Sequence, residues 1–202
     1  MTVILERLTG AFALNCELFF LTLLFSLPLG LVVAFGSMSR CAPLRGVVKT
    51  FVWVIRGTPL MLQLLFVYYG LPFIPGIGIR MDDFQAAIFA FVLNYAAYFC
   101  EIFRAGIQAI PKGQYEAART LGMNYVQTMR RIILPQVFRI ILPPVSNETI
   151  TLVKDTSLAF AIAYTEMFTM AKQIAAAQTS MVPYIAAGIF YYVFNLLVAM
   201  IM

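Results

Sequence analysis

Five stretches of this chain are long and apolar enough to cross a lipid bilayer, and they limit what it can fold into. A membrane-spanning helix needs about 20 largely apolar residues, because the hydrocarbon layer is about 30 Å thick and each residue rises about 1.5 Å. We expect spans over residues 13–36, 57–73, 84–103, 140–170 and 182–202, with the amphipathic segment 47–55 leading into the second. The sequence predicts an all-α, polytopic membrane protein in a single domain, residues 1–202.

The overall composition supports this prediction. Apolar residues make up 62% of the chain and charged residues only 11%. A soluble domain has about 45–50% apolar and about 25% charged residues, so these residues cannot build a water-compatible surface. We therefore expect an integral membrane protein.

The residues that are missing or scarce exclude several classes of function. The chain has no histidine, which excludes a Ser-His-Asp triad, a Cys-His pair, a histidine-ligated zinc site and a two-histidine iron site. Its three cysteines, Cys16, Cys41 and Cys100, are too widely spaced for a disulfide framework or a metal knuckle. No catalytic residue, cofactor or metal site is expected. The net charge of +5 is better explained by basic cytoplasmic loops than by nucleic-acid binding.

The orientation follows from the lysines and arginines between the expected spans. Residues 37–49 carry three and residues 104–139 carry six, whereas the other three segments outside the spans carry one each. The positive-inside rule places the two basic segments in the cytoplasm. With five spans, the N-terminus lies outside and the C-terminus inside. The last span ends at Met202 without a basic tail, which leaves open whether the sequence is truncated.

The cytoplasmic loop over residues 104–139 should be folded. Residues 116–121 can form a short helix with Glu116 near the positive end of its dipole, and Gly122 supplies a C-terminal stop. Asn124 can cap a second helix that runs toward Leu134 and Pro135. Such a helical hairpin could dock a protein partner or lie on anionic lipid, and the residues alone favour neither.

Polar residues inside the spans indicate where a path could run. Asn94, Tyr98 and Glu101 share one helix face, as do two further sets: Asn15, Thr22 and Ser26, and Tyr184, Gly188, Tyr191 and Asn195. For the hydroxyl and tyrosine positions, hydrogen bonds between helices or an aromatic belt are favoured over a contact with substrate. Small residues four apart, Gly30 with Ala34 and Ala159 with Ala163, could mark close-packing surfaces.

Charges within the spans are harder to explain without a path, because each costs about 2.5–3.5 kcal/mol at the bilayer centre. The fourth span contains Glu148, Lys154, Asp155 and Glu166, and Pro143-Pro144 with Thr156-Ser157 favour a broken helix there. Asp155 and Glu166 are candidates for binding a substrate ammonium or a cationic side chain; the alternative is a buried pair with Lys154 or Arg104. Arg56 could bind a carboxylate or be a snorkelling anchor. The path candidates are Arg56, Asn94, Tyr98, Glu101, Asp155 and Glu166.

The loop resembles a known signature. Glu116-Ala117-Ala118, followed by Gly122, Ile132 and Leu134-Pro135, is similar to the EAA motif in permease subunits of bacterial ABC importers of type I. Three further segments resemble the polar amino acid branch of that family: Arg56-Gly57-Thr58-Pro59-Leu60 with Gln63, residues 101–107 and residues 154–158. The resemblance implies five spans in the bacterial inner membrane with the N-terminus outside. It also implies that the first loop helix is a coupling helix that fits a groove on an ATPase, which favours partner docking over the lipid surface.

The resemblance implies a function as well. The chain would form the path for a polar amino acid, without being an enzyme itself; an ATPase subunit, a second permease subunit and an extracytoplasmic solute-binding protein would complete the importer. In agreement, no GxxxxGK[ST] phosphate-binding loop occurs in the sequence. The alternatives are a proton-coupled secondary transporter that relays protons through Glu101, Asp155 and Glu166, and a membrane anchor that only docks an ATPase. The sequence does not decide whether the substrate is a basic amino acid, glutamine, glutamate or cystine, although the intramembrane acids favour a cation. It also leaves open whether the two permease subunits are identical or different.

Overall fold

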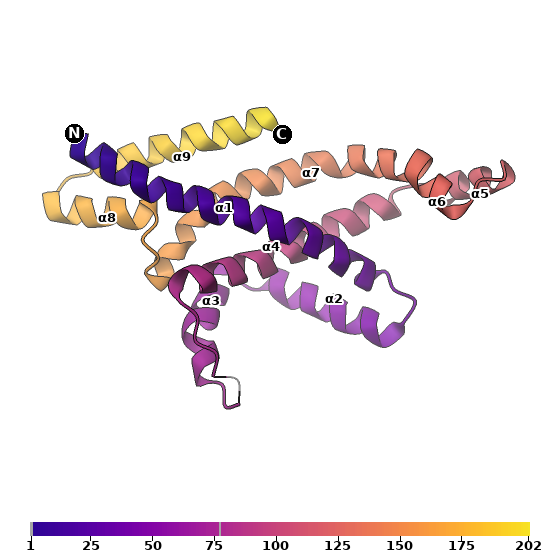
Figure 1. The fold of residues 1–202 in the computed structure, drawn as a ribbon, viewed down its shortest axis with the longest axis horizontal. Coiled ribbons are helices and arrows are strands. Elements are labelled where there is room, and N and C mark those ends of the chain that lie inside the picture. Colours follow the sequence, from indigo (N-terminus) through magenta and orange to yellow (C-terminus); the bar gives the residue numbers. More distant parts are fainter. Residues whose placement is uncertain (1, 77) are drawn as a thin grey trace.

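The computed structural model describes residues 2–76 and 78–202, and in these residues every regular element is helical. Four long helices run roughly side by side along the length of the molecule (Figure 1). These are α1 (Thr2–Ser37), α4 (Asp83–Gln108), α7 (Leu134–Asp155) and α9 (Val182–Ile201). Five shorter helices complete the set: α2 (Ala42–Gly57), α3 (Leu60–Leu65), α5 (Lys112–Thr120), α6 (Tyr125–Thr128) and α8 (Met167–Gln178). The predicted all-α fold is confirmed.

Helix α4 lies at the centre of the bundle, and its closest neighbour is α1. At Gly30 the two backbones approach so closely that an added Cβ would lie 2.8 Å from Cβ of Phe99 and 3.0 Å from the carbonyl oxygen of Ala96. Ala34, one turn further along α1, is fully buried in a cluster with Cys100 of α4. The prediction that Gly30 and Ala34 mark a packing surface is confirmed, because small side chains let the helices meet.

The second expected span, residues 57–73, begins later than predicted, at Leu60, and a sharp bend separates it from α2, which holds the amphipathic segment that leads into it. The axis bends by 107° between α2 and the segment that begins with α3. Pro59 causes the break, because it lacks the N–H that would bond the carbonyl of Ile55. The side chain of Gln63 replaces that donor: its Nε2 lies 2.7 Å from the Ile55 oxygen and 3.1 Å from the Thr58 oxygen.

The fourth expected span also differs from the structure. Among the residues that the structure describes, three helices are long and apolar enough to cross a membrane, α1, α4 and α9, and the bent pair α2–α3 makes up to four. Helix α7 does not qualify, since its charged residues lower its hydropathy, and it ends at Asp155 instead of continuing to residue 170. A 3-10 helix follows over Thr156–Ile162.

The break predicted at Thr156-Ser157 is thus confirmed, whereas Pro143-Pro144 lie inside α7 without ending it. The hydroxyls of Thr156 and Ser157 donate to the carbonyls of Val153 and Lys154, an alternative to regular helix bonding. Ala163 takes a left-handed conformation with φ 61° and is exposed. The predicted packing of Ala159 with Ala163 on one helix is therefore wrong.

The two ends of the molecule are formed by different segments of the chain. The N-terminus lies at one end, and α5 and α6 form the extremity at the other (Figure 1). The α1–α2 connection, which contains Arg40, lies toward the same end as α5 and α6. The two segments predicted to be cytoplasmic are therefore on one side of the fold.

Candidate functional site

Three adjoining cavities, each lined in part by charged and polar side chains, follow one side of α4. Their volumes are about 480, 440 and 360 Å³. Arg56 and Glu101 line the first two cavities, and Tyr98 and Glu148 line the second and third. We call this surface the polar strip and define it by Arg56, Asn94, Tyr98, Glu101, Glu148 and Asp155. Its walls are the end of α2, the bend at Pro59, α4 and α7.

A charged cluster occupies one end of the strip. Both Nε and Nη2 of Arg104 donate to the carboxylate of Glu101, with Nε 3.1 Å from Oε1. Nη1 of Arg56 lies 3.9 Å from Oε2 of the same carboxylate, and its guanidinium lies 5.1 Å from the ring centroid of Tyr98. Because Arg104 binds Glu101 in a bidentate manner, Arg56 keeps most of its capacity to bind another anion. Arg56 thus faces the strip, which a simple snorkelling anchor need not do.

The other end of the strip carries carboxylates on α7. Asp155 accepts a hydrogen bond from the hydroxyl of Tyr95 at 2.7 Å. Glu148, Thr151 and Asp155 line the same cavity, at the spacing that places them on one helix face. In the described part of the chain, the ion pairs involve Glu101 and neither Glu148 nor Asp155. These two carboxylates remain free to bind a cationic group.

Asn94 positions its surroundings as well as lining the strip. Its Nδ2 donates to Oε1 of Gln63 at 3.0 Å, and only 4% of the residue is exposed. Gln63 in turn holds the bend between α2 and α3. The Asn94–Gln63 pair therefore fixes the wall of the strip on which Arg56 stands.

Glu166 does not line the polar strip, so the structure does not bring it together with the other predicted path residues. It is fully buried and caps the N-terminus of α8, accepting from the backbone N–H groups of Phe168 and Thr169. Tyr191 Oη and Asn15 Nδ2 lie 3.1 and 3.4 Å from its Oε2. Among the described residues, Glu166 forms no hydrogen bond or ion pair with Lys154 or Arg104, its predicted alternative partners. All its bonding capacity is used to join α1, α8 and α9.

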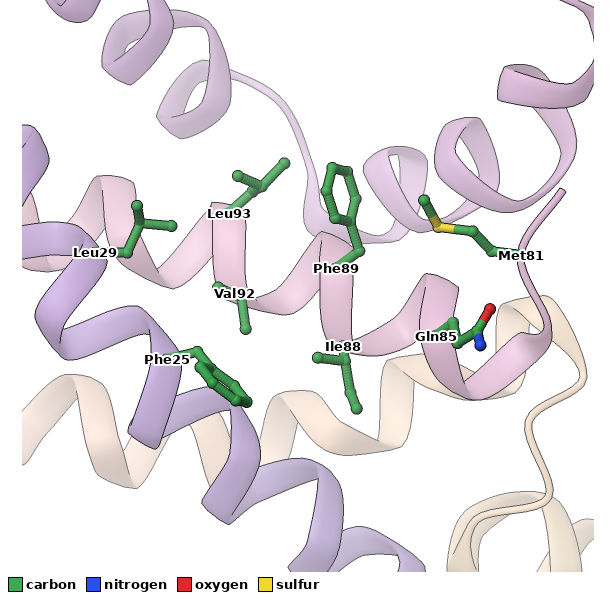
Figure 2. A pocket seen from close by; sticks show the side chains of 8 residues that line it. All are labelled: Phe25, Leu29, Met81, Gln85, Ile88, Phe89, Val92 and Leu93. Carbon is green, nitrogen blue, oxygen red and sulfur yellow. The ribbon is translucent and has the colours of Figure 1, made fainter. Parts of the chain in front are cut away.

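A separate apolar cavity of about 650 Å³ lies between α1 and the first half of α4. Figure 2 shows Phe25 of α1 facing Ile88 and Val92 of α4 across it. Apart from Gln85, every side chain that lines this cavity is apolar. It can hold hydrocarbon but offers a zwitterion almost no hydrogen bonds, so it is not part of the polar strip.

The loop over residues 104–139 folds into α5 and α6, as its end signals predict. Gly122 has φ 72°, and the N–H groups of Gly122 and Met123 bond the carbonyls of Arg119 and Ala118 at 2.9 and 3.0 Å, which terminates α5. Asn124 and Gln127 form a capping box at the start of α6. Because α5 begins at Lys112, Glu116 lies in its second turn, so the predicted contact with the positive end of the dipole is wrong.

The EAA residues divide between the surface and the base of this loop. Glu116, Ala117 and Gly122 are exposed, whereas Ala118 is 1% exposed. Ile132 packs on a small core made by Ile110, Ile133 and Val137, while Leu134 and Pro135 begin α7 and are exposed. At the extremity three large apolar side chains face outward: Leu121, Tyr125 and Val126. Sequence reasoning missed these three, although apolar residues flanking a helix stop are a readable signal.

Sequence reasoning also left Glu148 out of the candidate path. Its spacing of seven residues from Asp155 was the available signal. No group of three or more cysteine, aspartate or glutamate residues that could hold a metal occurs in the described residues.

Comparisons with known proteins agree with this picture. The profile of a protein family described as a binding-protein-dependent transport system inner membrane component matches residues 26–202. The L-cystine transport system permease protein TcyB of Bacillus subtilis (strain 168) is 41% identical over 196 residues, which cover 96% of this chain and 82% of the relative. The arginine transport system permease protein ArtQ of the same organism is 40% identical, covering 94% and 86%.

Solved structures with the same architecture exist as well. A chain from the crystal structure of an amino acid ABC transporter with histidines superposes with a TM-score of 0.90 at 34% identity, covering 100% of this chain and 93% of that one. A chain of the MetNI methionine ABC transporter in an inward facing conformation has a TM-score of 0.68 at 20% identity, covering 98% and 92%, and shares the fold.

Proposed function

The chain belongs to the family of binding-protein-dependent transport system inner membrane components, and from that premise we propose that it forms the path through which an ATP-driven importer carries polar amino acids. The family makes it a multi-pass inner-membrane protein that works with an ATPase and a solute-binding protein and does not hydrolyse ATP itself. Its relatives are permease proteins for L-cystine and arginine. A proton-coupled secondary transporter finds no support.

The polar strip is the observation that carries the proposal. A zwitterionic amino acid needs an anionic partner for its ammonium and a cationic partner for its carboxylate, since burying either charge unpaired is costly. Glu148 and Asp155 supply the first, and Arg56, held beside Tyr98, supplies the second. Two carboxylates without an ion-pair partner in the described residues favour a substrate with a second positive charge.

Orientation and assembly complete the proposal. The end with α5 and α6 faces the cytoplasm, the N-terminus lies outside and the C-terminus inside. The ATPase docks on the coupling loop, with Glu116 and Ala117 on the exposed side of α5 and the apolar tip Leu121, Tyr125 and Val126 entering its groove. A second permease subunit closes the strip from the open side, because one copy leaves the side chain of Arg56 42% exposed.

Uptake into proteoliposomes tests this function. The chain is reconstituted with its ATPase and binding protein, and uptake of arginine, cystine, glutamine and glutamate is measured with and without ATP. We expect ATP-dependent uptake that is highest for arginine. In Glu148→Gln the uptake should fall at least about tenfold, which corresponds to about 1.4 kcal/mol of lost ion pairing with the substrate. Lys154→Gln, on the exposed side of α7, is the matched control and should keep its uptake. Uptake driven by a proton gradient without the ATPase would overturn the proposal.

A further inference from the structure

Two glutamine side chains tie α5 to α7 by a reciprocal pair of hydrogen bonds. Nε2 of Gln114 lies 2.8 Å from Oε1 of Gln136, and Nε2 of Gln136 lies 2.6 Å from Oε1 of Gln114. Gln136 uses its second N–H on the carbonyl of Ile132 at 2.7 Å. Among the described residues, this pair provides the only side-chain hydrogen bonds that α5 makes outside itself. Both side chains are half-buried, which protects the pair from competition by water.

The helix that receives this link also carries the carboxylates of the polar strip. From Tyr125 to Asp155 the backbone is helical without a break, through α6, a π-helical turn over Met129–Ile133, and α7. Gln136 stands in the first turn of α7, and Glu148 and Asp155 stand in its second half. A displacement of α5 that reaches Gln136 is therefore carried along one continuous helix to the strip.

The crossing of α7 with α4 lies between these two points. At Gly106 the helices are in direct contact, since an added Cβ would lie 2.2 Å from Cγ2 of Ile141. Along α7 the order is Gln136, Ile141, Glu148. A contact in which the Ile141 side chain packs directly on the α4 backbone at Gly106 can serve as a pivot, so that movement on the Gln136 side appears on the Glu148 side in the opposite direction.

Apolar contacts alone do not fix how α5 sits along α7. Tyr115 packs on the small core of Ile110, Ile133 and Val137, but such contacts are non-directional and tolerate sliding. A cyclic amide pair has a defined distance and angle, so it sets one register between the two helices.

We propose that the Gln114–Gln136 pair is a positioning link that passes the movement of α5 to α7, and hence to Glu148 and Asp155. The proposal rests on the proposed function, in which the ATPase moves α5. Without the pair, the ATPase still binds the exposed surface of the loop, but part of its movement is lost in sliding between α5 and α7.

The test measures how many substrate molecules are taken up per ATP hydrolysed, in proteoliposomes with the complete importer. Gln136→Met and Gln114→Met keep the side-chain length and remove the pair. Gln114→Glu with Gln136→Lys replaces it by an ion pair of similar reach. Gln173→Met, at an exposed position of α8 without a side-chain hydrogen bond among the described residues, is the matched control. The amount of ATPase that co-purifies with each variant is measured in parallel.

We expect each single variant to lower uptake per ATP at least about 3-fold, the range for loss of a neutral hydrogen bond, while the ATPase co-purifies as before. The Glu–Lys variant should return to within about twofold of the unaltered protein, and Gln173→Met should not change. An unchanged ratio in both methionine variants, or a loss of ATPase binding in proportion to uptake, would overturn the inference and leave the proposed function standing. If the unaltered importer shows no ATP-dependent uptake, the proposed function itself fails.

Discussion

Replacing Gly106 by alanine should weaken the fold at the crossing of α4 and α7. The added Cβ would lie 2.2 Å from Cγ2 of Ile141, whereas an ordinary contact begins at 3.4 Å, so about 1.2 Å of movement is needed. Ile141 cannot easily supply it, because a β-branched side chain in a helix is restricted to one main rotamer. The helices themselves must separate.

The expected loss of stability is about 1–3 kcal/mol, the usual effect of forcing an extra methyl group into a packed contact. For a chain of this size each kcal/mol corresponds to about 2–4 °C. The unfolding midpoint in detergent should therefore fall by roughly 2–12 °C, as measured by thermal denaturation followed by circular dichroism or by tryptophan fluorescence.

Two further variants separate the clash from other effects of the substitution. Gly46→Ala lies in α2 with no atom within 4 Å of the added Cβ, so helix propensity alone should act and raise stability by about 0.5–1 kcal/mol. Ile141→Ala removes the clashing methyl group, and adding Gly106→Ala to it should then cost less than about 0.5 kcal/mol. An unchanged midpoint in Gly106→Ala, or equal losses in both backgrounds, would refute the crossing geometry.

Three other substitutions test separate parts of the structure. Glu166→Gln should destabilise the fold by about 1–3 kcal/mol, because the amide nitrogen would face the N–H donor of either Phe168 or Thr169. Uptake per folded molecule should stay normal; thermal denaturation and uptake are measured together, and lost uptake at full stability would support Glu166 as a path residue. Gln63→Leu should remove the shortest hydrogen bond to the Ile55 carbonyl and leave Nδ2 of Asn94 without its partner, which should destabilise the fold by a similar amount and lower uptake by displacing Arg56. Normal uptake would show that the bend holds without Gln63. Asn124→Ala removes the cap of α6, which should lower the free energy of unfolding by about 1 kcal/mol and speed proteolysis of the loop. A cleavage rate equal to that of the unaltered protein would count against the capping box.

Local signals in the sequence predicted local structure well. Gly122 and Asn124 mark the end of α5 and the start of α6, because a left-handed residue and a capping side chain act within a few residues of themselves. The shared face of Asn94, Tyr98 and Glu101 also follows from helical periodicity alone, and all three line the polar strip.

What the sequence left undetermined depends on how helices are placed against each other. Glu166 looks like a path residue in a list of intramembrane charges, but its partner Asn15 comes from a segment 151 positions away. Glu148 joins the strip only because α7 is rotated to face Tyr98. The bend at Pro59 required knowing that Gln63 would take over the free carbonyl, which is a side-chain role that hydropathy does not register.

The central claim is that α5 and α6 project into the cytoplasm and receive the ATPase. A photo-reactive phenylalanine analogue at Tyr125, whose side chain is 72% exposed at the tip, tests this directly in living cells. We predict a cross-link to the ATPase subunit after illumination. Adducts with lipid and none with an ATPase would contradict the account, because the hairpin would then lie on the membrane surface.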